Sequence, residues 1–326
     1  MQNLGQVGVN VDLSILEQTC DIVMGGDGTN PNFDQANKSL MEFQNRDDAW
    51  IYAPKLIDNT TSIAAKFFGL QILHNLVKIK WAIMDQEQKE SIKNFVCQHV
   101  FNWSQQEGVV NYVLNQIDAV LVELILKEWP QEWPSIVNDL ISSATTEPRT
   151  CQNNLKVIAM LSHQVVDFGS QEMTSTRILQ VSAALNGIAP DVFQLVEQVL
   201  SGTNDSQVII SSLEAFRYIV KWLDSHFIFE TELLGALCNS FLINPQYQSY
   251  VLSIIGEIAS KPNIPDRYTQ IFPGIFDLIV TALRQTISDS NIVDLAFESP
   301  ETIKSLTFTL SSILSAYGSV IEQSKQ

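Results

Sequence analysis

The residues that most often carry chemistry are present in this chain, but their spacing fits no metal site. A zinc site built on one helix needs ligands about three or four residues apart. The histidines are instead isolated from one another, at His74, His99, His163 and His226. We expect them to pack in the core or to lie on the surface. His99 falls on the apolar side of its segment, so a hydrogen-bonded core position is predicted for it, and no metal site is predicted.

No catalytic constellation is recognisable either. Gly25-Gly26-Asp27-Gly28 resembles a phosphate-binding loop, but no Lys-Ser/Thr follows it and the GxGxxG spacing is absent, so we interpret it as a connector. Asp47-Asp48 and Asp289 are carboxylates of the kind used in acid–base catalysis, yet 36 acidic residues make such neighbours expected by chance. No Ser, Cys or Lys has a nucleophile context such as GxSxG. The sequence therefore predicts no catalytic residues and no cofactor.

The charge balance argues against nucleic acid as a direct partner. The chain has 19 Lys and Arg against 36 Asp and Glu, a formal net charge of −17, with a sequence pI near 4.5. Affinity for nucleic acid comes mostly from clustered Lys and Arg that displace counterions from phosphates. Here the basic residues are few and scattered among acids. An acidic surface suits a basic protein partner instead, because opposite charges speed encounter.

The remaining composition indicates a folded protein of a reducing compartment. Hydrophobic residues make up 45% of the chain, which is enough apolar surface to offset chain entropy. No stretch is long and apolar enough to span a membrane and no signal-peptide pattern opens the chain, so no membrane contact is expected. The cysteines form no CxxC pair and lie far apart, at Cys20, Cys97, Cys151 and Cys238.

These side chains are expected to be positioned by helices. Between residues 110 and 128, apolar residues recur in steps of three and four, which predicts a helix with one broad buried face. No segment alternates with the period of two that a strand requires. Similar helical patterns cover Ile63 to Trp81, Ile92 to Trp103, Leu155 to Phe168, Ile209 to Leu223 and Tyr250 to Ile258.

The helices recur at a nearly regular interval. Every second helix is predicted to start near residue 62, 109, 149, 204, 245 and 299, close to the roughly 40 to 47 residue period of helix-pair solenoids, with two insertions. One helix pair cannot bury its apolar face alone, so successive pairs must stack. We predict an all-α solenoid of HEAT-like helical hairpins with about seven helix pairs, forming a curved rod. The last helix, 299–322, has an apolar face without a polar capping repeat, so a longer parent chain is expected.

One segment predicts a tight corner between two helices: Glu128-Trp129-Pro130-Gln131-Glu132-Trp133-Pro134. Pro130 disfavours helical geometry at Trp129 and ends the preceding helix, whereas Pro134 suits the first turn of the next. The indoles of Trp129 and Trp133 are placed to pack between both helices and to fix their angle. We interpret Trp129, Pro130, Trp133 and Pro134 as a structural corner.

Together with three further segments, this corner resembles the karyopherin-β family of nuclear transport receptors, and within it the exportin-1-like branch. The similarity is dense from residue 33 to 168 and thinner but collinear to about residue 262. The three further segments are Phe68-Gly69-Leu70-Gln71-Ile72-Leu73 with Trp81 downstream, Cys151-Gln152-Asn153-Asn154-Leu155, and Phe229-Glu230-Thr231.

The resemblance implies three parts of the chain. Residues 1–32 would be an N-terminal segment with a first partial helix. Residues 33–146 would be importin-β N-terminal-like repeats that bind the small GTPase Ran in its GTP form. Residues 147–326 would be further repeats, which we expect to be truncated at 326. The implied role is nuclear export by a receptor that shuttles between nucleus and cytoplasm, with export cargo and nucleoporins bound through the full-length chain and no enzyme activity.

The resemblance also implies which surface binds Ran, namely the second helices of the early repeats. Helical phase then selects the residues that point away from the buried stripe of each helix. In this reading Phe101 would be an exposed apolar anchor. The candidates are Glu90, Asn94, Cys97 and Phe101 on the helix at 86–104, and Ser135, Asn138, Asp139 and Ser142 on the helix at 134–146.

Two other functions remain open at this point. The first is a HEAT-repeat scaffold or adaptor that holds peptides along its groove and has no Ran partner. The second is another exportin-type karyopherin, such as an exporter of RNA, which shares the Trp-Pro corner. An RNA exporter would need a basic concave surface, which the net charge of −17 disfavours.

Overall fold

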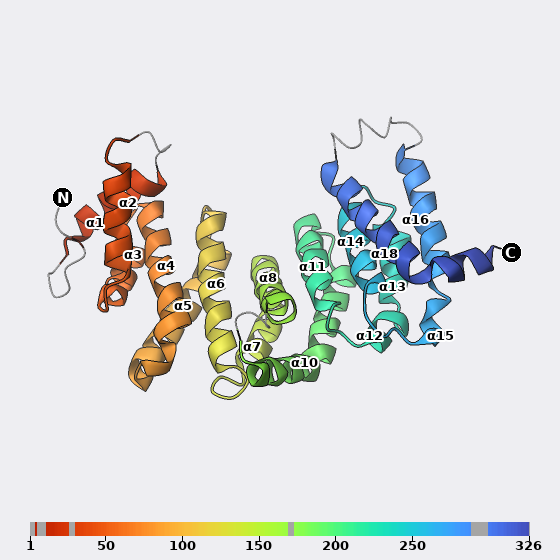
Figure 1. Cartoon of the computed structure of the whole chain (residues 1–326), viewed down its shortest axis with the longest axis horizontal. Helices are drawn as coiled ribbons and strands as arrows, with labels where there is room; N and C mark the ends of the chain where they lie inside the picture. The colour runs from red at the N-terminus through yellow and green to blue at the C-terminus, as the bar shows by residue number, and fades with distance from the viewer. Residues whose placement is uncertain (1–3, 5–10, 26–29, 169–172, 288–298, 326) are drawn as a thin grey trace. The chain divides into compact units, whose positions relative to one another are not determined.

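The computed structural model describes residues 4, 11–25, 30–168, 173–287 and 299–325. Within these residues the chain is helical and contains no β-strand (Figure 1). It divides into two compact units, Met1–Trp133 (unit 1) and Pro134–Gln326 (unit 2). Residues 26–28 of the glycine-rich segment and Asp289 lie outside the described residues. The prediction of an all-α chain is confirmed.

Unit 1 is a row of helices in which each packs on its neighbours. α4 (Ile63–Lys80) packs against α6 (Asn111–Glu128), and α5 (Gln86–Gln105) packs on α6. α3 (Ala53–Asp58) and α1 (Leu13–Met24) pack against α4 from the N-terminal side. The remaining elements are α2 (Phe33–Gln44), η1 (Ala49–Ile51) and η2 (Trp81–Ile83).

Unit 2 repeats the same scheme with a longer row. α8 (Pro148–His163), α11 (Ser206–Ile219), α14 (Gln248–Ala259) and α18 (Pro300–Ser324) pack one against the next (Figure 1). The other elements are α7 (Ile136–Ser143), η3 (Gln164–Phe168), α10 (Ser175–Gly202), α12 (Ser225–Phe229), α13 (Leu233–Ala236), η4 (Leu237–Phe241), α15 (Asp266–Thr269) and α16 (Phe272–Ile287).

The helices that form each row are those whose starts the sequence predicts. α4, α6, α8, α11, α14 and α18 begin at residues 63, 111, 148, 206, 248 and 300, and the largest deviation is at α14, which was expected near 245. Local signals set these starts: the hydroxyl of Ser62 accepts from the N–H of Ala65, and the carboxylate of Asp205 accepts from Gln207 and Val208.

The ends of the helices differ more from expectation than their starts. The helix predicted to reach Trp81 stops at Lys80 and continues as the 3₁₀ turn η2, and the last turn of the helix predicted to reach Phe168 is the π-helix η3. α11 ends at Ile219 rather than Leu223. Helix ends lack intrahelical partners for their last carbonyls, so their geometry depends on tertiary contacts that periodicity does not encode.

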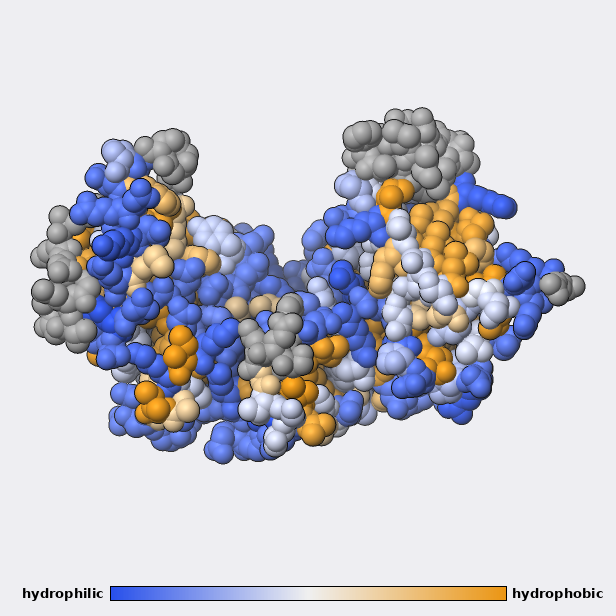
Figure 2. Space-filling view, viewed as in Figure 1, coloured by the Kyte–Doolittle hydropathy of each residue, from blue (hydrophilic) through white to orange (hydrophobic). Residues whose placement is uncertain are grey.

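The exposed apolar residues are spread over the surface, with one broader area in unit 2. Figure 2 shows this apolar area over α16 and α18, and exposed residues on these helices include Leu278, Phe308 and Leu314. The apolar face predicted for the last helix is therefore present. In the part of the chain that the structure describes, no helix combines the length and apolarity needed to cross a membrane.

Gly69 lies where α4 closely approaches α3. A Cβ atom at this position would lie 3.1 Å from the carbonyl oxygen of Ala53 and 3.1 Å from Cγ1 of Ile57, both on α3. These distances are shorter than ordinary van der Waals contact, and the carbonyl belongs to helical backbone that cannot rotate away. The glycine in the Phe68-Gly69-Leu70 segment is thus required by the packing of α3 on α4.

We expect Gly69→Ala to lower the free energy of unfolding by about 1–2 kcal/mol, because α3 must move outward to admit the methyl group. Gly187→Ala on α10 is the matched control, since a Cβ there meets nothing within 4 Å and Ala favours helix. Urea-induced unfolding followed by circular dichroism measures both variants. Equal or greater stability of Gly69→Ala than of the control would show that α3 and α4 are not in tight contact.

A buried polar network joins three elements of unit 1. Lys93 on α5 donates to Glu128 at the end of α6, with Nζ 2.8 Å from Oε2, and Trp81 of η2 donates its indole N–H to Oε1 of Glu128 at 3.1 Å. The side chains of Lys93 and Glu128 are only 7% and 6% exposed. Burial of this pair is tolerable because both carboxylate oxygens have donors. The network fixes α5 against the end of α6.

We expect Glu128→Gln to lower the free energy of unfolding by about 2–3 kcal/mol, because the buried Lys93 loses the buried one of its two carboxylate partners and keeps only the half-exposed Glu90. The matched control is Glu42→Gln, whose partner Lys38 is 3.9 Å away on the exposed surface of α2; a loss below about 0.5 kcal/mol is expected there. Replacing both members, Lys93→Met with Glu128→Leu, should recover part of the loss, because no charge is then left buried although the indole N–H of Trp81 loses its acceptor. Chemical unfolding of the three variants tests this, and similar losses for Glu128→Gln and Glu42→Gln would contradict it.

Candidate functional site

The first candidate surface is the outer face of α5 in unit 1. Glu90, Asn94 and Phe101 are exposed, and Phe101 keeps 52% of its surface accessible. Cys97 is half-buried, because it lies one turn after the buried Lys93, on the side of the helix that turns toward its neighbours. The predicted outward positions are therefore confirmed for Glu90, Asn94 and Phe101 but not for Cys97, and Phe101 is an apolar side chain in a polar setting.

Two neighbouring side chains of α5 hold the carboxylate of Glu90 in position. Lys93 Nζ lies 2.6 Å from Oε1 of Glu90, and the amide of Gln86 donates to the same oxygen at 2.9 Å. The hydrogen bond from Lys93 lowers the pKa of Glu90 below its usual value. Burial by itself would lower the pKa of Lys93, but its hydrogen bonds with Glu128 and Glu90 raise it. Both groups therefore stay charged, and the network holds a negative charge at Glu90, about three turns before Phe101 on the same helix.

The Trp-Pro corner, residues 128–134, contacts α5 through Trp133. Pro130 ends α6 as predicted, since Trp129 is the extended C-cap residue after Glu128. The Trp129 ring is buried, whereas Trp133 is half-buried and its ring lies 5.2 Å below the ammonium of Lys93. Pro134 precedes the next helix by two residues instead of forming its first turn. The sequence predicts that the two indoles pack between the helices on either side of the corner. In the structure Trp133 also contacts α5, an earlier helix, which was not predicted.

The second candidate surface is the outer face of α7 in unit 2. Ser135, Asn138, Asp139 and Ser142 are all exposed, and the opposite side of the helix buries Val137, Leu140 and Ala144. Asp139 lies in the first turn, where a negative charge is stabilised by the helix dipole. The helix is shorter than the predicted span of 134–146. The candidates nevertheless share one face, as expected from their spacing.

Sequence reasoning did not identify the residue that holds α7. Asn154 on α8 donates from Nδ2 to the carbonyl oxygen of Leu140 at 2.9 Å and to Oγ of Ser143 at 2.8 Å. These contacts satisfy acceptors at the C-terminal end of α7, where intrahelical donors run out. Asn154 belongs to the Cys151-Gln152-Asn153-Asn154-Leu155 segment, so its side chain type is explained by this cap. In the sequence, only the polarity of this segment within an otherwise apolar helix could have indicated the capping role of Asn154.

A third segment, Phe229-Glu230-Thr231, also has a packing role in unit 2. The ring of Phe229 stacks on Tyr268 with centroids 4.7 Å apart, and the Tyr268 hydroxyl donates to Glu230. Arg267 pairs with the same carboxylate at 3.1 Å. The segment therefore fastens α12 to α15. The sequence segments that carry the family resemblance are thus tied to structure rather than to chemistry.

His99 and two of the cysteines have structural surroundings. His99 contacts the carbonyl of Phe95 at 2.9 Å and the carboxylate of Asp58 at 2.8 Å, so the predicted hydrogen bonding is confirmed, but the residue is half-buried rather than in the core. Burial raises the pKa of Cys20 to about 12 and that of Cys238 to about 11, so neither thiol is poised as a nucleophile. Among the described residues, no three His, Cys, Asp or Glu side chains group as metal ligands.

Comparison with known proteins agrees with this arrangement. The family model described as importin-beta N-terminal domain matches residues 36–102, and the model described as exportin 1-like protein matches residues 110–255. Exportin-1 of Schizosaccharomyces pombe is 26% identical over 280 residues, which cover 85% of this chain and 26% of that protein. EXPORTIN 1B of Arabidopsis thaliana is 27% identical over 286 residues, covering 87% of this chain and 26% of its own length.

A solved structure shows the same fold. The exportin Cse1 in its cargo-free, cytoplasmic state matches with a TM-score of 0.62 at 13% identity, over 94% of this chain and 34% of Cse1. The chain spans about a quarter of the length of the curated relatives described above, 26% in each case. The two family matches follow each other along residues 36–255 and agree with the helical solenoid, so this part of the chain matches the importin-β and exportin family.

Proposed function

We propose that this chain forms the Ran-GTP-binding part of a nuclear export receptor. The observation that carries the proposal is the match of residues 36–102 to the importin-beta N-terminal domain, which includes most of α5 and its exposed Glu90 and Asn94. Phe101, seven residues or about two turns after Asn94, lies within the same matched segment. The segment therefore combines a fixed carboxylate with an exposed aromatic ring on one helix.

The charges of this surface favour a basic partner. The pair Glu90 and Lys93 leaves the carboxylate at the surface and the ammonium buried, with Glu90 50% and Lys93 7% exposed. The second candidate surface, on α7 of unit 2, has an exposed carboxylate of its own at Asp139. Such charges speed association with a basic surface, and an apolar ring that loses water on binding contributes most of the affinity. Phe101 is therefore the proposed anchor, and the acids select the partner.

The mechanism proposed for the whole receptor is linkage without chemistry. Ran-GTP and export cargo would each favour the same conformation of the solenoid, so each would raise the affinity for the other by the same factor. The receptor would shuttle between nucleus and cytoplasm, with nucleoporins and cargo contacting the longer chain. A HEAT scaffold without Ran is the competing function, and the experiment below separates the two.

We expect the chain to bind Ran loaded with a non-hydrolysable GTP analogue in preference to Ran-GDP. Phe101→Arg should weaken this binding about tenfold or more, because it removes the apolar anchor and adds a charge facing a basic partner. Asp139→Arg should weaken it mainly through slower association at low salt. Biolayer interferometry with immobilised Ran at two ionic strengths measures these effects.

The matched control is Ile79→Arg on α4, which changes an apolar residue that is 75% exposed outside the candidate surface. It should leave Ran binding unchanged, and circular dichroism should show native helix content in all three variants. Equal capture of the GTP and GDP forms would reject the proposed function. Loss of binding in Ile79→Arg to the same extent as in Phe101→Arg would reject the assignment of the site.

A further inference from the structure

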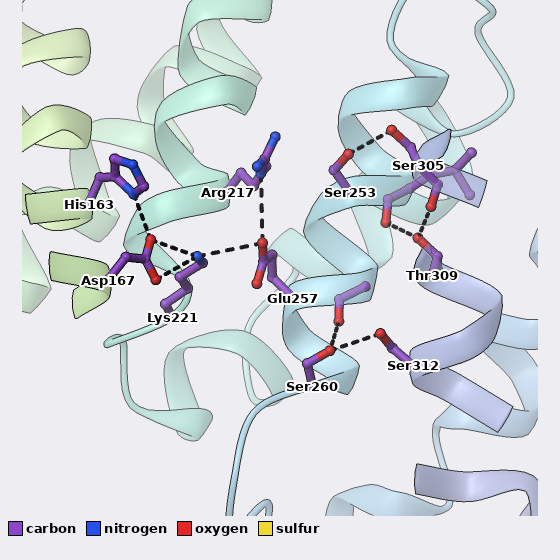
Figure 3. Close-up of polar contacts among 12 residues, drawn as sticks. His163, Asp167, Arg217, Lys221, Ser253, Glu257, Ser260, Ser305, Thr309 and Ser312 are labelled. Carbon is purple, nitrogen blue, oxygen red and sulfur yellow. Dashed lines mark hydrogen bonds and ion pairs between the residues drawn. The ribbon is translucent and has the colours of Figure 1, made fainter. Parts of the chain in front are cut away.

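Polar side chains connect the successive helices of the unit 2 row. Figure 3 shows these contacts running from η3 across α11 and α14 to α18. Two kinds of contact are present: ion pairs join η3, α11 and α14, whereas hydroxyl groups join α14 and α18. The residues are His163, Asp167, Arg217, Lys221 and Glu257 for the ion pairs, and Ser253, Ser260, Ser305, Thr309 and Ser312 for the hydroxyl contacts.

Lys221, in the turn that follows α11, lies between carboxylates of two different helical elements. Its Nζ is 3.0 Å from Oδ2 and 3.1 Å from Oδ1 of Asp167 on η3, which is a two-oxygen hydrogen-bonded contact. The same Nζ is 3.7 Å from Oε1 of Glu257 on α14. One ammonium thus serves two acids, with a hydrogen bond to one and only a longer-range attraction to the other.

Two cations lie near Glu257, but neither is within hydrogen-bond distance of its carboxylate, whereas Lys221 is within that distance of Asp167. Its second cation, Arg217, places Nε 3.8 Å from Oε1, again beyond hydrogen-bond distance. The Glu257 side chain is only 15% exposed. Burial raises the pKa of Glu257, and Lys221 and Arg217 only partly oppose this rise. A closer approach of Lys221 would therefore stabilise the Glu257 carboxylate.

Asp167, in contrast, has a second donor of its own. His163, one turn earlier, lies with Nδ1 2.6 Å from Oδ2 of Asp167. Burial alone would raise the pKa of Asp167, but the hydrogen bonds from Lys221 and His163 lower it. If Lys221 moved toward Glu257, Asp167 would keep the His163 contact. A transfer of Lys221 from Asp167 to Glu257 would therefore leave each acid with one donor.

The other end of the row offers no such alternative. A Cβ at Gly256 would lie 2.6 Å from the ring of Phe308 on α18, so α14 and α18 are in direct contact. Thr309 donates to the carbonyl of Leu252, and the Ser253 and Ser260 hydroxyls lie 2.8 and 2.9 Å from Ser305 and Ser312. These short contacts fix α18 on α14. α18 would thus move together with α14, so any change of spacing within the row lies between η3, α11 and α14.

We propose that Lys221 is a shared cation that couples the spacing between η3 and α11 to the spacing between α11 and α14. Movement of the ammonium from Asp167 toward Glu257 draws α14 closer to α11 and releases η3, and the reverse movement does the opposite. The groups that face Lys221 are Asp167 and His163 from α8 and η3, Arg217 from α11, and Glu257 from α14. This coupling does not depend on the identity of any partner.

The test is Asp167→Asn in the whole chain, followed by hydrogen–deuterium exchange with mass spectrometry. Without the Asp167 charge, Lys221 pairs with Glu257, so amides of α14 should exchange about two- to fivefold more slowly, the range expected for one partly exposed ion pair. Amides of η3 should exchange faster. The double variant Asp167→Asn with Lys221→Met should lose the slowing in α14, because no shared cation remains.

Asp277→Asn is the matched control, since it makes the same substitution at an exposed acid of α16 whose partner is Lys325, 3.5 Å away. It should leave α14 exchange unchanged. Unchanged or faster exchange of α14 in Asp167→Asn would overturn the proposal. Slowing that persists in the double variant, or that also occurs in Asp277→Asn, would overturn it equally, because Lys221 would then not carry the effect.

Discussion

Every helix here must bury a broad apolar stripe, and in the described residues no sheet offers a surface for it. The stripe can only be covered by the next helix, so each unit becomes a row in which polar groups on inward-facing turns are trapped between helices. Such groups need partners on the neighbouring helix. Glu128 with Lys93, Asn154 with Leu140, and Thr309 with Leu252 are the result. The specific geometry of each row follows from these pairings.

The same constraint explains why helix ends are capped from a distance. After α11, three carbonyl oxygens, those of Val220, Lys221 and Leu223, all accept from the ammonium of Lys261 at 2.8 to 3.0 Å. A cation at a helix C-terminus is favourable because it meets the negative end of the helix dipole. Burial nevertheless lowers the pKa of Lys261 to about 8. The backbone of the turn that holds Lys221 is therefore fixed by Lys261. The side chain of Lys221 takes no part in these bonds and lies between Asp167 and Glu257.

The sequence predicts the rows well because periodicity and caps are local. The starts of α4 and α11 follow from Ser62 and Asp205, and the end of α6 follows from Pro130. The contacts of the candidate face are less predictable. From the sequence, Lys93 would be expected on the surface. It is buried because it pairs with Glu128, which lies 35 residues later in the chain. Pairings between helices that are distant in sequence decide which charges are fixed, and periodicity carries no information about them.

Within unit 2, the candidate face on α7 and the shared cation are joined by continuous structure. Asn154 ties the end of α7 to α8, and α8 runs directly into η3, which carries Asp167. Trp222, beside Lys221, donates its indole N–H to Ser162 of α8 at 3.0 Å. A partner that displaces α7 would thus move α8 and with it the acid that competes for Lys221. Because binding linkage is reciprocal, a shift of Lys221 toward Glu257 would change the affinity at α7 by the same free energy.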